Sequence, residues 1–413
     1  MNELTVVFLL FLVLSVGLQI WLTWRHKVYV QAHQHAVPDT FAEKISLADH
    51  QKAANYTLAK ISFGQKMLVI EVLVLLLWTL GGLLNMLDQT WRYLEWPELW
   101  TGVAVLISYS ILSSLIDLPS DIYSTFRLEA RFGFNRTTPG LFVTDMLKGV
   151  VLSFAIGVPF IALILWLMTS AGEFWWVSVW AVWIGFSLLM IWIYPTFIAP
   201  LFNKFQPLDN EELKQRIEAL LQGNGFTSQG IFVMDGSKRS GHGNAYFTGF
   251  GSNKRIVFFD TLLEALNADE VIAVLAHEVG HFKRKHLQKR IILMSILSLA
   301  GLAFLGWLMQ QGWFYSGLGV STPSTYMALL LFALALPVFT FLLQPIMAWF
   351  SRKHEFEADD FAAEQANPLT LIQALVKLYK DNASTLTPDP LYSAFYDSHP
   401  PAPVRIAHLS SKL

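Results

Sequence analysis

The sequence predicts a multi-pass α-helical membrane protein that carries a small α+β catalytic domain. Three observations support this fold class: seven long apolar segments, a polar stretch between the fifth and the sixth, and a metal-binding motif inside that stretch. Hydrophobic residues make up 54% of the 413 residues and charged residues 15%, whereas soluble domains carry about 25% charged residues. The net charge of −2 indicates no nucleic-acid partner, and the absence of cysteine excludes disulfides and cysteine metal ligands.

Seven segments are apolar over the roughly 20 residues that a helix needs to cross a bilayer. They are residues 4–24, 66–87, 100–118, 147–169, 174–201, 291–309 and 326–350. The first is interpreted as an anchor rather than a cleaved signal peptide. It lacks a basic start and a small-residue cleavage site, and Arg25, His26 and Lys27 follow it.

The distribution of basic residues predicts the orientation in the membrane. Lysine and arginine are frequent after the first, third, fifth and seventh spans, whereas the three opposite loops contain only Arg92. The N-terminus is therefore expected outside, and the polar domain and C-terminus in the cytoplasm. The membrane would be the inner membrane of a bacterium or the endoplasmic reticulum of a eukaryote. Aromatic residues such as Trp91, Trp313 and Tyr315 are expected to form a belt at the outer boundary.

The polar stretch 203–289 is typical of a small α/β core. Asp209–Glu212 predicts the start of a helix that Gly223 ends. Strands are predicted at residues 231–234, 245–250 and 255–259, with a turn at 251–254 and a helix starting near Asp260. The strand Ala245–Phe250 would offer a free edge to an extended peptide, although an ordinary hairpin strand without substrate contact fits the sequence equally well.

His277, Glu278 and His281 form the pattern HExxH, which follows a capping box at Asn267–Glu270. Histidines four residues apart lie on one face of a helix and can bind one zinc ion. The glutamate between them is placed to act on a metal-bound water. Taken alone, the pattern leaves open a partly buried helix that happens to carry two histidines.

A catalytic zinc site needs a third protein ligand and keeps its fourth position for water. A histidine six residues after the second is excluded because Leu287 stands there. His286 is expected to point around the helix as part of a basic juxtamembrane face. After the seventh span, Glu355 and Asp359 lie four residues apart on one helical face, so one can bind zinc while the other orients a histidine. Glu357 is interpreted as a solvated surface charge.

Together these segments resemble the type I CAAX prenyl proteases, which are integral-membrane zinc endopeptidases with HExxH and ExxxD motifs. The resemblance covers nearly the whole chain, with matches at residues 242–250, 253–264, 277–281, 351–359 and 398–401. It implies seven helices around a water-filled chamber, a zincin-like domain, and one zinc ion per chain. It also implies that Glu355 is the third ligand and Asp359 the carboxylate that orients a ligand. Asn244 would contact the substrate backbone, and His399 and Arg405 would stabilise the reacting carbonyl oxygen.

The predicted site therefore contains three groups of residues. The catalytic residues are Glu278, His399 and Arg405; the zinc ligands are His277, His281 and Glu355, with Asp359 behind them; the substrate-binding residues are Asn244, Ala245, Tyr246 and Phe247. Without the resemblance, Arg405 fits a charge that sets membrane topology, and His399 fits a structural residue held by the prolines that follow it.

Four segments are expected: membrane helices in 1–202, the catalytic segment 203–289, two further membrane helices in 290–350, and a C-terminal segment 351–413 with the third ligand. The predicted function is zinc-dependent peptide hydrolysis, and the resemblance implies that it removes the C-terminal tripeptide of prenylated proteins. The expected partners are the lipid bilayer and a peptide or protein substrate.

Three alternatives stay open. A bacterial cell makes no such prenylated proteins, so the enzyme would there serve membrane-protein quality control. A non-catalytic transporter or receptor would need a structural zinc with a fourth protein ligand, and none is evident. An intramembrane protease would need HExxH inside a span, whereas the charged residues 282–286 follow it directly.

Overall fold

Seven helical segments of the protein are long and apolar enough to cross a membrane. The computed structural model describes residues 2–248 and 253–413, and the seven segments lie within them. They are Glu3–His33, Leu47–Trp78, Glu98–Phe132, Pro139–Ser170, Trp175–Phe202, His286–Leu308 and Thr325–Gln365. The predicted membrane fold and its number of spans are confirmed.

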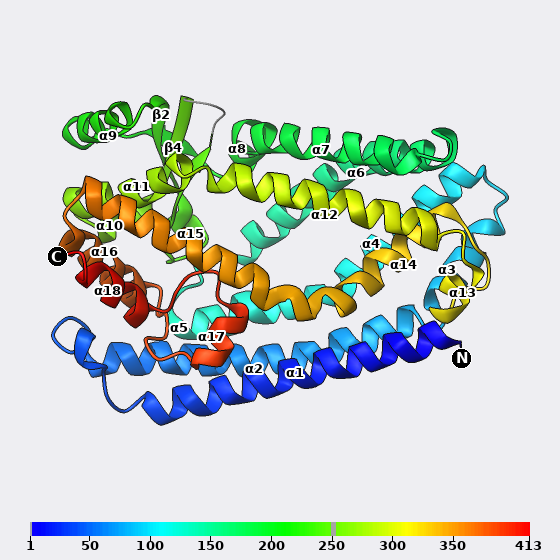
Figure 1. Ribbon diagram of the computed structural model, residues 1–413, viewed down its shortest axis with the longest axis horizontal. Helices are drawn as coiled ribbons and strands as arrows, with labels where there is room; N and C mark the ends of the chain where they lie inside the picture. The colour runs from blue at the N-terminus through cyan, green and yellow to red at the C-terminus, as the bar shows by residue number, and fades with distance from the viewer. Residues whose placement is uncertain (1, 249–252) are drawn as a thin grey trace.

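The spans run along the long axis of the molecule, with the N-terminus at one end and the C-terminus and sheet at the other (Figure 1). Their helices are α1 (Glu3–His33), α2 (Leu47–Trp78), α4 (Glu98–Tyr123), α6 (Pro139–Ser170), α7 (Trp175–Ile193), α12 (His286–Leu308), α14 (Thr325–Thr340) and α15 (Gln344–Gln365). Wider π turns at Ser124–Glu129 and Tyr194–Ile198 continue α4 and α7 into α5 (Ala130–Phe132) and α8 (Ala199–Phe202).

The second span ends earlier than the predicted apolar run 66–87. Helix α2 ends at Trp78, and α3 (Leu83–Arg92) is a separate helix. Gly82 lies between them with a φ of 81°, a left-handed conformation that glycine adopts without a steric penalty. The apolar run therefore continues through a helix break, which hydropathy alone does not reveal.

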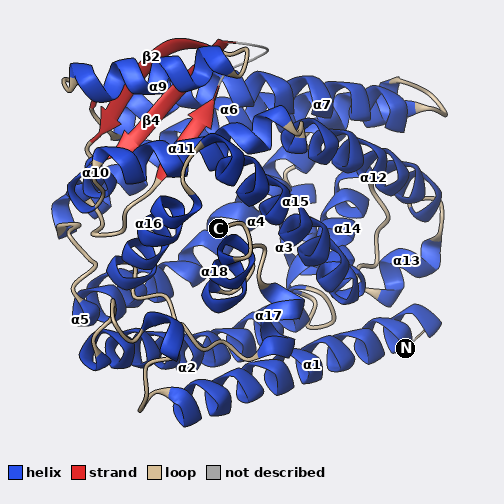
Figure 2. Cartoon of the chain, turned by 60° about the vertical axis from the view of Figure 1, so that its left-hand side comes forward, coloured by secondary structure: helices blue, strands red, loops and turns tan. Residues whose placement is uncertain are grey.

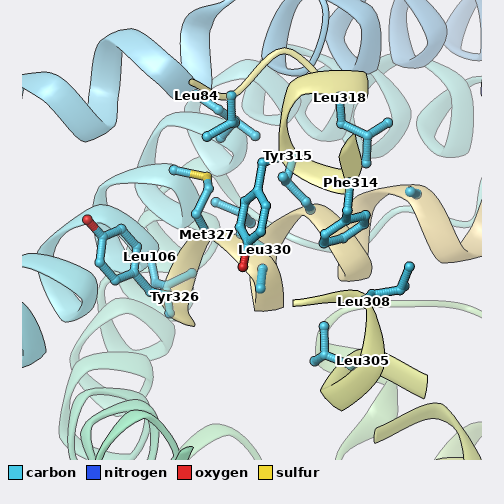
Figure 3. Close-up of a cluster of buried hydrophobic side chains, with 14 of the residues drawn as sticks. Leu84, Leu106, Leu305, Leu308, Phe314, Tyr315, Leu318, Tyr326, Met327 and Leu330 are labelled. Atoms are coloured by element: carbon cyan, nitrogen blue, oxygen red, sulfur yellow. The ribbon is translucent and has the colours of Figure 1, made fainter. Parts of the chain in front are cut away.

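A hydrophobic cluster lies at the end of the bundle opposite the sheet (Figure 1), and Figure 3 shows some of its side chains. It joins α3, α4, α12 and α14 to the short helix α13 (Gly312–Gly317), with buried side chains that include Leu84, Leu106, Leu305, Leu308, Phe314, Tyr315, Leu318, Tyr326, Met327 and Leu330. The hydroxyl of Tyr326 donates to Asp88 Oδ1 at 2.6 Å, so its polar atom is paired. Tyr315 is 2% exposed, so its predicted place in an aromatic belt is wrong.

The polar segment folds into a four-stranded sheet beside three helices, as Figure 2 shows at one corner of the molecule. The strands are β1 (Phe205–Pro207), β2 (Thr227–Met234), β3 (Ala245–Thr248) and β4 (Asn253–Phe259), and the helices are α9 (Glu211–Gly223), α10 (Asp260–Ala265) and α11 (Ala268–Lys283). The order is β1-β2-β4-β3, with β2 parallel to β4 and the other pairs antiparallel.

The structure contains the three predicted strands, although β2 begins four residues before the predicted position 231. Strand β1 was not predicted. Residues 249–250 of the predicted strand and 251–252 of the predicted turn lie outside the described residues, whereas residues 253–254 of that turn belong to β4.

The C-terminal segment packs against the sheet-end domain. Helices α16 (Pro368–Asp381) and α18 (Ala402–Ser410) share a hydrophobic cluster with α11, whose members include Ala273, Ala276, Leu371, Leu375, Ile406 and Leu409. Helix α17 (Pro390–Tyr396) is tied to α1 by the ion pair of Asp389 with Arg25 at 2.9 Å. These contacts bring the last helices of the chain next to the HExxH helix.

Candidate active site

Helix α11 positions the HExxH motif. Its predicted capping box is present: Asn267 Oδ1 accepts from the Glu270 amide at 3.0 Å, and Glu270 Oε2 accepts from the Asn267 amide at 2.8 Å. Buried residues on the apolar side of the helix are Val271, Ala273, Leu275, Ala276 and Val279. The helix is thus fixed at its start and along one face, and it holds His277 inside the protein at 6% exposure.

Three side-chain donors converge on one point. His277 Nε2 lies 3.2 Å from His281 Nε2 and 3.5 Å from Glu355 Oε2, while His281 Nε2 lies 3.4 Å from Glu355 Oε1. Donors about 2.0–2.1 Å from a tetrahedral metal ion would lie about 3.4 Å apart, so the spacing fits. The buried Glu355 Oε2 has no hydrogen-bond partner, which also fits an oxygen that binds a cation. His277, His281 and Glu355 form a metal-binding group.

Glu355 reaches this group because α15 passes very close to α11. A Cβ atom at Gly280 would lie 3.1 Å from both Cα and O of Ala358, which is tighter than ordinary packing. Glycine at this position therefore lets the backbones approach until the carboxylate of Glu355 faces both histidines. Glu355 is 5% exposed, so the approach also removes it from solvent.

Asp359 and Arg405 lie behind His277. Asp359 Oδ1 is 2.8 Å from His277 Nδ1, and Arg405 donates from Nε and Nη2 to the two Asp359 oxygens at 2.7 Å each. Burial alone would lower the pKa of Arg405, but the hydrogen bonds and charge of Asp359 outweigh burial and raise that pKa. Arg405 is a buried cation that clamps Asp359, so a role as a topology charge on the surface does not fit. Its Nη1 lies 3.9 Å from Glu355 Oε2.

Glu278 and His399 are, with Arg405, the residues that the sequence analysis assigned to catalysis. Glu278 is half-buried and has no hydrogen bond or ion pair with another described residue. His399 Nε2 is 3.4 Å from Glu355 Oε1. Although 63% of its side chain is exposed, the surrounding protein partly desolvates the ring. This desolvation lowers the pKa of His399, while the carboxylate of Glu355 opposes that shift.

Strand β3 carries the predicted substrate-binding residues at the edge of the sheet. It pairs with β4 on one side, and on its other side no strand of the described chain pairs with it. Asn244 is exposed just before the strand, and its carbonyl accepts from the Phe259 amide at 2.9 Å. The ring of Phe247 lies 5.8 Å from that of Phe282, the residue after His281. The predicted free edge therefore lies against the HExxH helix.

Two residues of the site were missed by the sequence analysis. His286 is 5% exposed, and its two ring nitrogens lie 3.0 Å from His281 Nδ1 and 3.0 Å from Glu357 Oε2. The interpretations of His286 as part of a basic face and of Glu357 as a solvated charge are wrong. The interpretation of His286 assumed a continuous helix, but the chain breaks at Lys285, where φ is 58°, and His286 turns back as the first residue of α12, where it meets Glu357.

Comparison with known proteins shows matches along most of the chain. The family model described as CAAX prenyl protease N-terminal, five membrane helices, matches residues 26–204, and that of peptidase family M48 matches residues 207–413. A CAAX prenyl protease 1 homolog from Arabidopsis thaliana is 40% identical over 297 residues, covering 71% of this chain and 70% of the relative. CAAX prenyl protease 1 of Saccharomyces cerevisiae is 34% identical over 418 residues, covering 94% and 91%.

A solved structure matches an even larger share of this chain. The crystal structure of S. mikatae Ste24p matches with a TM-score of 0.92 and 32% sequence identity, and the match covers 99% of both chains. The family, the fold and the metal-binding group are thus consistent with one another. The chain belongs to the CAAX prenyl protease 1 (Ste24) family of M48 membrane metallopeptidases.

Proposed function

We propose that this metallopeptidase binds one zinc ion per chain and removes the C-terminal tripeptide of prenylated proteins at the cytoplasmic side of its membrane. The observation that carries the proposal is the convergence of His277, His281 and Glu355. Their donor atoms lie 3.2–3.5 Å apart, and no other group of this kind occurs among the residues described. Three protein ligands leave one position for water, as in catalytic zinc sites. Bound zinc would activate a water molecule and polarise the scissile carbonyl.

The residues around the metal ligands take distinct roles. His277 binds through Nε2 while its Nδ1–H donates to Asp359, which fixes the ring and its tautomer. Glu278 accepts a proton from the attacking water and passes it to the nitrogen of the departing amine. This role suits Glu278 because it shares α11 with two ligands and its carboxylate is not engaged by another described group.

His399 and Arg405 contribute positive potential as negative charge develops on the carbonyl oxygen. His399 is accessible, and its Nε2 lies 3.4 Å from the metal ligand Glu355. Its Nε2–H can therefore donate to the carbonyl oxygen of the substrate. Arg405 has two of its nitrogens bound to Asp359, and its main task is therefore to hold that carboxylate. We assign direct stabilisation of the oxygen to His399 and a supporting charge to Arg405.

The substrate would bind as an additional strand along β3. An extended peptide can form main-chain hydrogen bonds along this unpaired edge, where Ala245 and Phe247 direct their main-chain groups away from β4 and Tyr246 lies between them. The exposed Asn244 at the start of the strand can bind the substrate backbone through its side-chain amide. The contact between Phe247 and Phe282 keeps this edge beside α11, so a bound peptide passes close to the metal ligands.

The proposal is tested with the purified, zinc-loaded protein and three substrates: a farnesylated C-terminal peptide, the same peptide without the farnesyl group, and an unfolded polypeptide. We expect cleavage after the prenylated cysteine, loss of activity with a chelator, and recovery with zinc. Glu278→Gln should retain zinc and lose about 10²–10⁴-fold in rate, the usual contribution of a general base. The matched control is Glu264→Gln on the exposed surface of α10, which should react normally.

Two outcomes would contradict parts of this proposal. Wild-type cleavage rates in zinc-loaded Glu278→Gln would show that Glu278 is not the base. Equal cleavage of the unfolded and the farnesylated substrate would favour membrane-protein quality control over prenyl-protein processing.

A further inference from the structure

We infer that His286 and Glu357 form a relay that positions the metal ligand His281. The inference rests on the proposed metal site and adds two residues to it. The relay runs from His281 Nδ1 to His286 Nδ1 over 3.0 Å, and from His286 Nε2 to Glu357 Oε2 over 3.0 Å. It connects α11, α12 and α15.

One assignment of protons satisfies the whole relay. His281 turns Nε2 toward His277 and Glu355, so its proton must be on Nδ1 when Nε2 binds a metal ion. That Nδ1–H donates to His286 Nδ1, which acts as the acceptor. The proton of His286 is then on Nε2 and donates to the carboxylate of Glu357. His281 Nδ1 and the two ring nitrogens of His286 each have a single hydrogen-bond partner among the described residues, and the carboxylate at the end fixes the direction of both hydrogen bonds.

The surroundings of His286 hold its ring in place. The ring is 5% exposed and stacks on His354 of α15, with centroids 4.1 Å apart and an angle of 11° between the planes. Lys285 adopts a φ of 58°, which is uncommon for a residue other than glycine, and this turn aims His286 at His281. Lys289 lies 3.9 Å from Glu357 Oε2 and supports its negative charge. Three elements therefore determine the position of one ring.

The two histidine ligands are held by different means. Asp359 contacts His277 directly and is itself clamped by Arg405. His281 has no carboxylate at its Nδ1; a histidine ring takes that place, and the carboxylate of Glu357 follows it. Partners of this kind fix the orientation of a ligand, and their loss typically weakens metal binding by about 10–100-fold. His286 and Glu357 are thus positioning residues, because they act on the metal only through His281.

The test compares two substitutions of His286 in the full-length protein. His286→Phe keeps the ring and the stack on His354 but removes both hydrogen-bonding nitrogens. His286→Asn loses the stack but places an amide oxygen near the position of Nδ1, where it can accept from His281. The measurements are the zinc dissociation constant by chelator competition and the thermal unfolding midpoint of the zinc-free protein.

We expect His286→Phe to bind zinc about 10–100-fold more weakly while the zinc-free protein unfolds at the wild-type temperature. His286→Asn should recover most of the zinc affinity, because the acceptor matters more than the ring. The control is His408→Phe, which removes the His408–Asp360 pair of 2.7 Å on another face of α15 and should leave zinc affinity unchanged. Wild-type affinity in His286→Phe, or equal losses in the Phe and Asn variants, would overturn the relay.

Glu357 gives a second, independent test, because its side chain is 32% exposed and tolerates substitution. Glu357→Leu should weaken zinc binding and Glu357→Gln should weaken it less, since the amide oxygen still accepts from His286. If His286→Phe does not fold, unchanged zinc affinity in Glu357→Leu overturns the relay. A wild-type protein that binds no zinc would instead refute the proposed function, so the two failures are distinguishable.

Discussion

Asp359 has two buried partners, His277 and Arg405, and no other carboxylate among the described residues lies as close to either of them. It binds His277 Nδ1 at 2.8 Å and both Nε and Nη2 of Arg405 at 2.7 Å, with 0% of its surface exposed. Removing one partner from a buried ion pair leaves an uncompensated charge, which is more costly than the pair itself is favourable. The charge of Asp359 therefore supports both the fold and the metal ligand.

Asp359→Asn should destabilise the zinc-free protein by about 3–5 kcal/mol, because the buried Arg405 cation loses its close anionic partner and keeps only the more distant Glu355, at 3.9 Å. The measurement is denaturant unfolding in detergent micelles. Asp360→Asn is the matched control: it removes the adjacent carboxylate, whose pairs with His408 and Lys412 are partly exposed, and should cost at most about 1 kcal/mol. Equal losses of unfolding free energy in the two variants would show that the buried ion pair stabilises the protein no more than the partly exposed pairs do.

At the level of residues, spacing predicted the site where helices are continuous and failed where they break. His277, His281, Glu355 and Asp359 lie where a four-residue spacing on helices puts them. His286 was missed because its position depends on the left-handed turn at Lys285, and lysine carries no sequence signal for that conformation. The catalytic assignments of Glu278, His399 and Arg405 stay predictions.

Among the elements, the contact of α11 with α15 determines the geometry of the metal ligands. The contact occurs where Gly280 faces Ala358, which is 0% exposed, and where Phe361 Cβ would lie 3.2 Å from a Cβ at Gly280. Since the obstacles are mostly backbone atoms and Cβ, they cannot rotate away from an added methyl group. The separation of the two helices is therefore set by the absence of a single side chain.

Gly280→Ala should push α15 a few tenths of an ångström away from α11 and misplace Glu355 relative to both histidines. We expect a loss of zinc affinity of about tenfold or more, because misplacing one ligand affects the whole site. The control is Gly223→Ala at the end of α9, where a Cβ would meet no atom within 4 Å. Zinc affinity by chelator competition is the readout, and an unchanged value in Gly280→Ala would mean that the helices separate without moving the ligand.

Element boundaries were predictable where composition changes and unpredictable where it does not. The start of α11 follows from Asn267 and Glu270, which cap it as their sequence pattern indicates. The end of α2 at Trp78 could not be located, since leucines continue on both sides of Gly82. Strand β1 is only three residues long and contains Pro207, so it carries almost no strand signal.

At the scale of the whole molecule, the sheet and the cluster around α13 lie at opposite ends of the spans (Figure 1). With seven spans and basic loops at the sheet end, the positive-inside rule predicts that the sheet lies in the cytoplasm. The rule acts on loop charge and gives no information on which membrane the protein occupies.

The absence of cysteine allows this orientation to be tested with single introduced thiols. Gln215→Cys lies on the exposed face of α9, and Tyr93→Cys lies in the loop after α3, where the tyrosine is 87% exposed. A membrane-impermeant maleimide should label Gln215→Cys from the cytoplasmic side only and Tyr93→Cys from the opposite side only. The unmodified protein is the control. Labelling of both thiols from one side would refute the orientation.

The active site is assembled from segments far apart along the chain: residues 277–281, His286, residues 355–359, and His399 with Arg405. During translation, the earlier segments leave the ribosome and enter the membrane while Arg405 has not yet been synthesised. Until then, Asp359 lacks its clamp and His277 lacks a fixed partner. A copy of this protease that is still being synthesised is therefore expected to be catalytically inactive toward other polypeptides that are inserted into the membrane beside it.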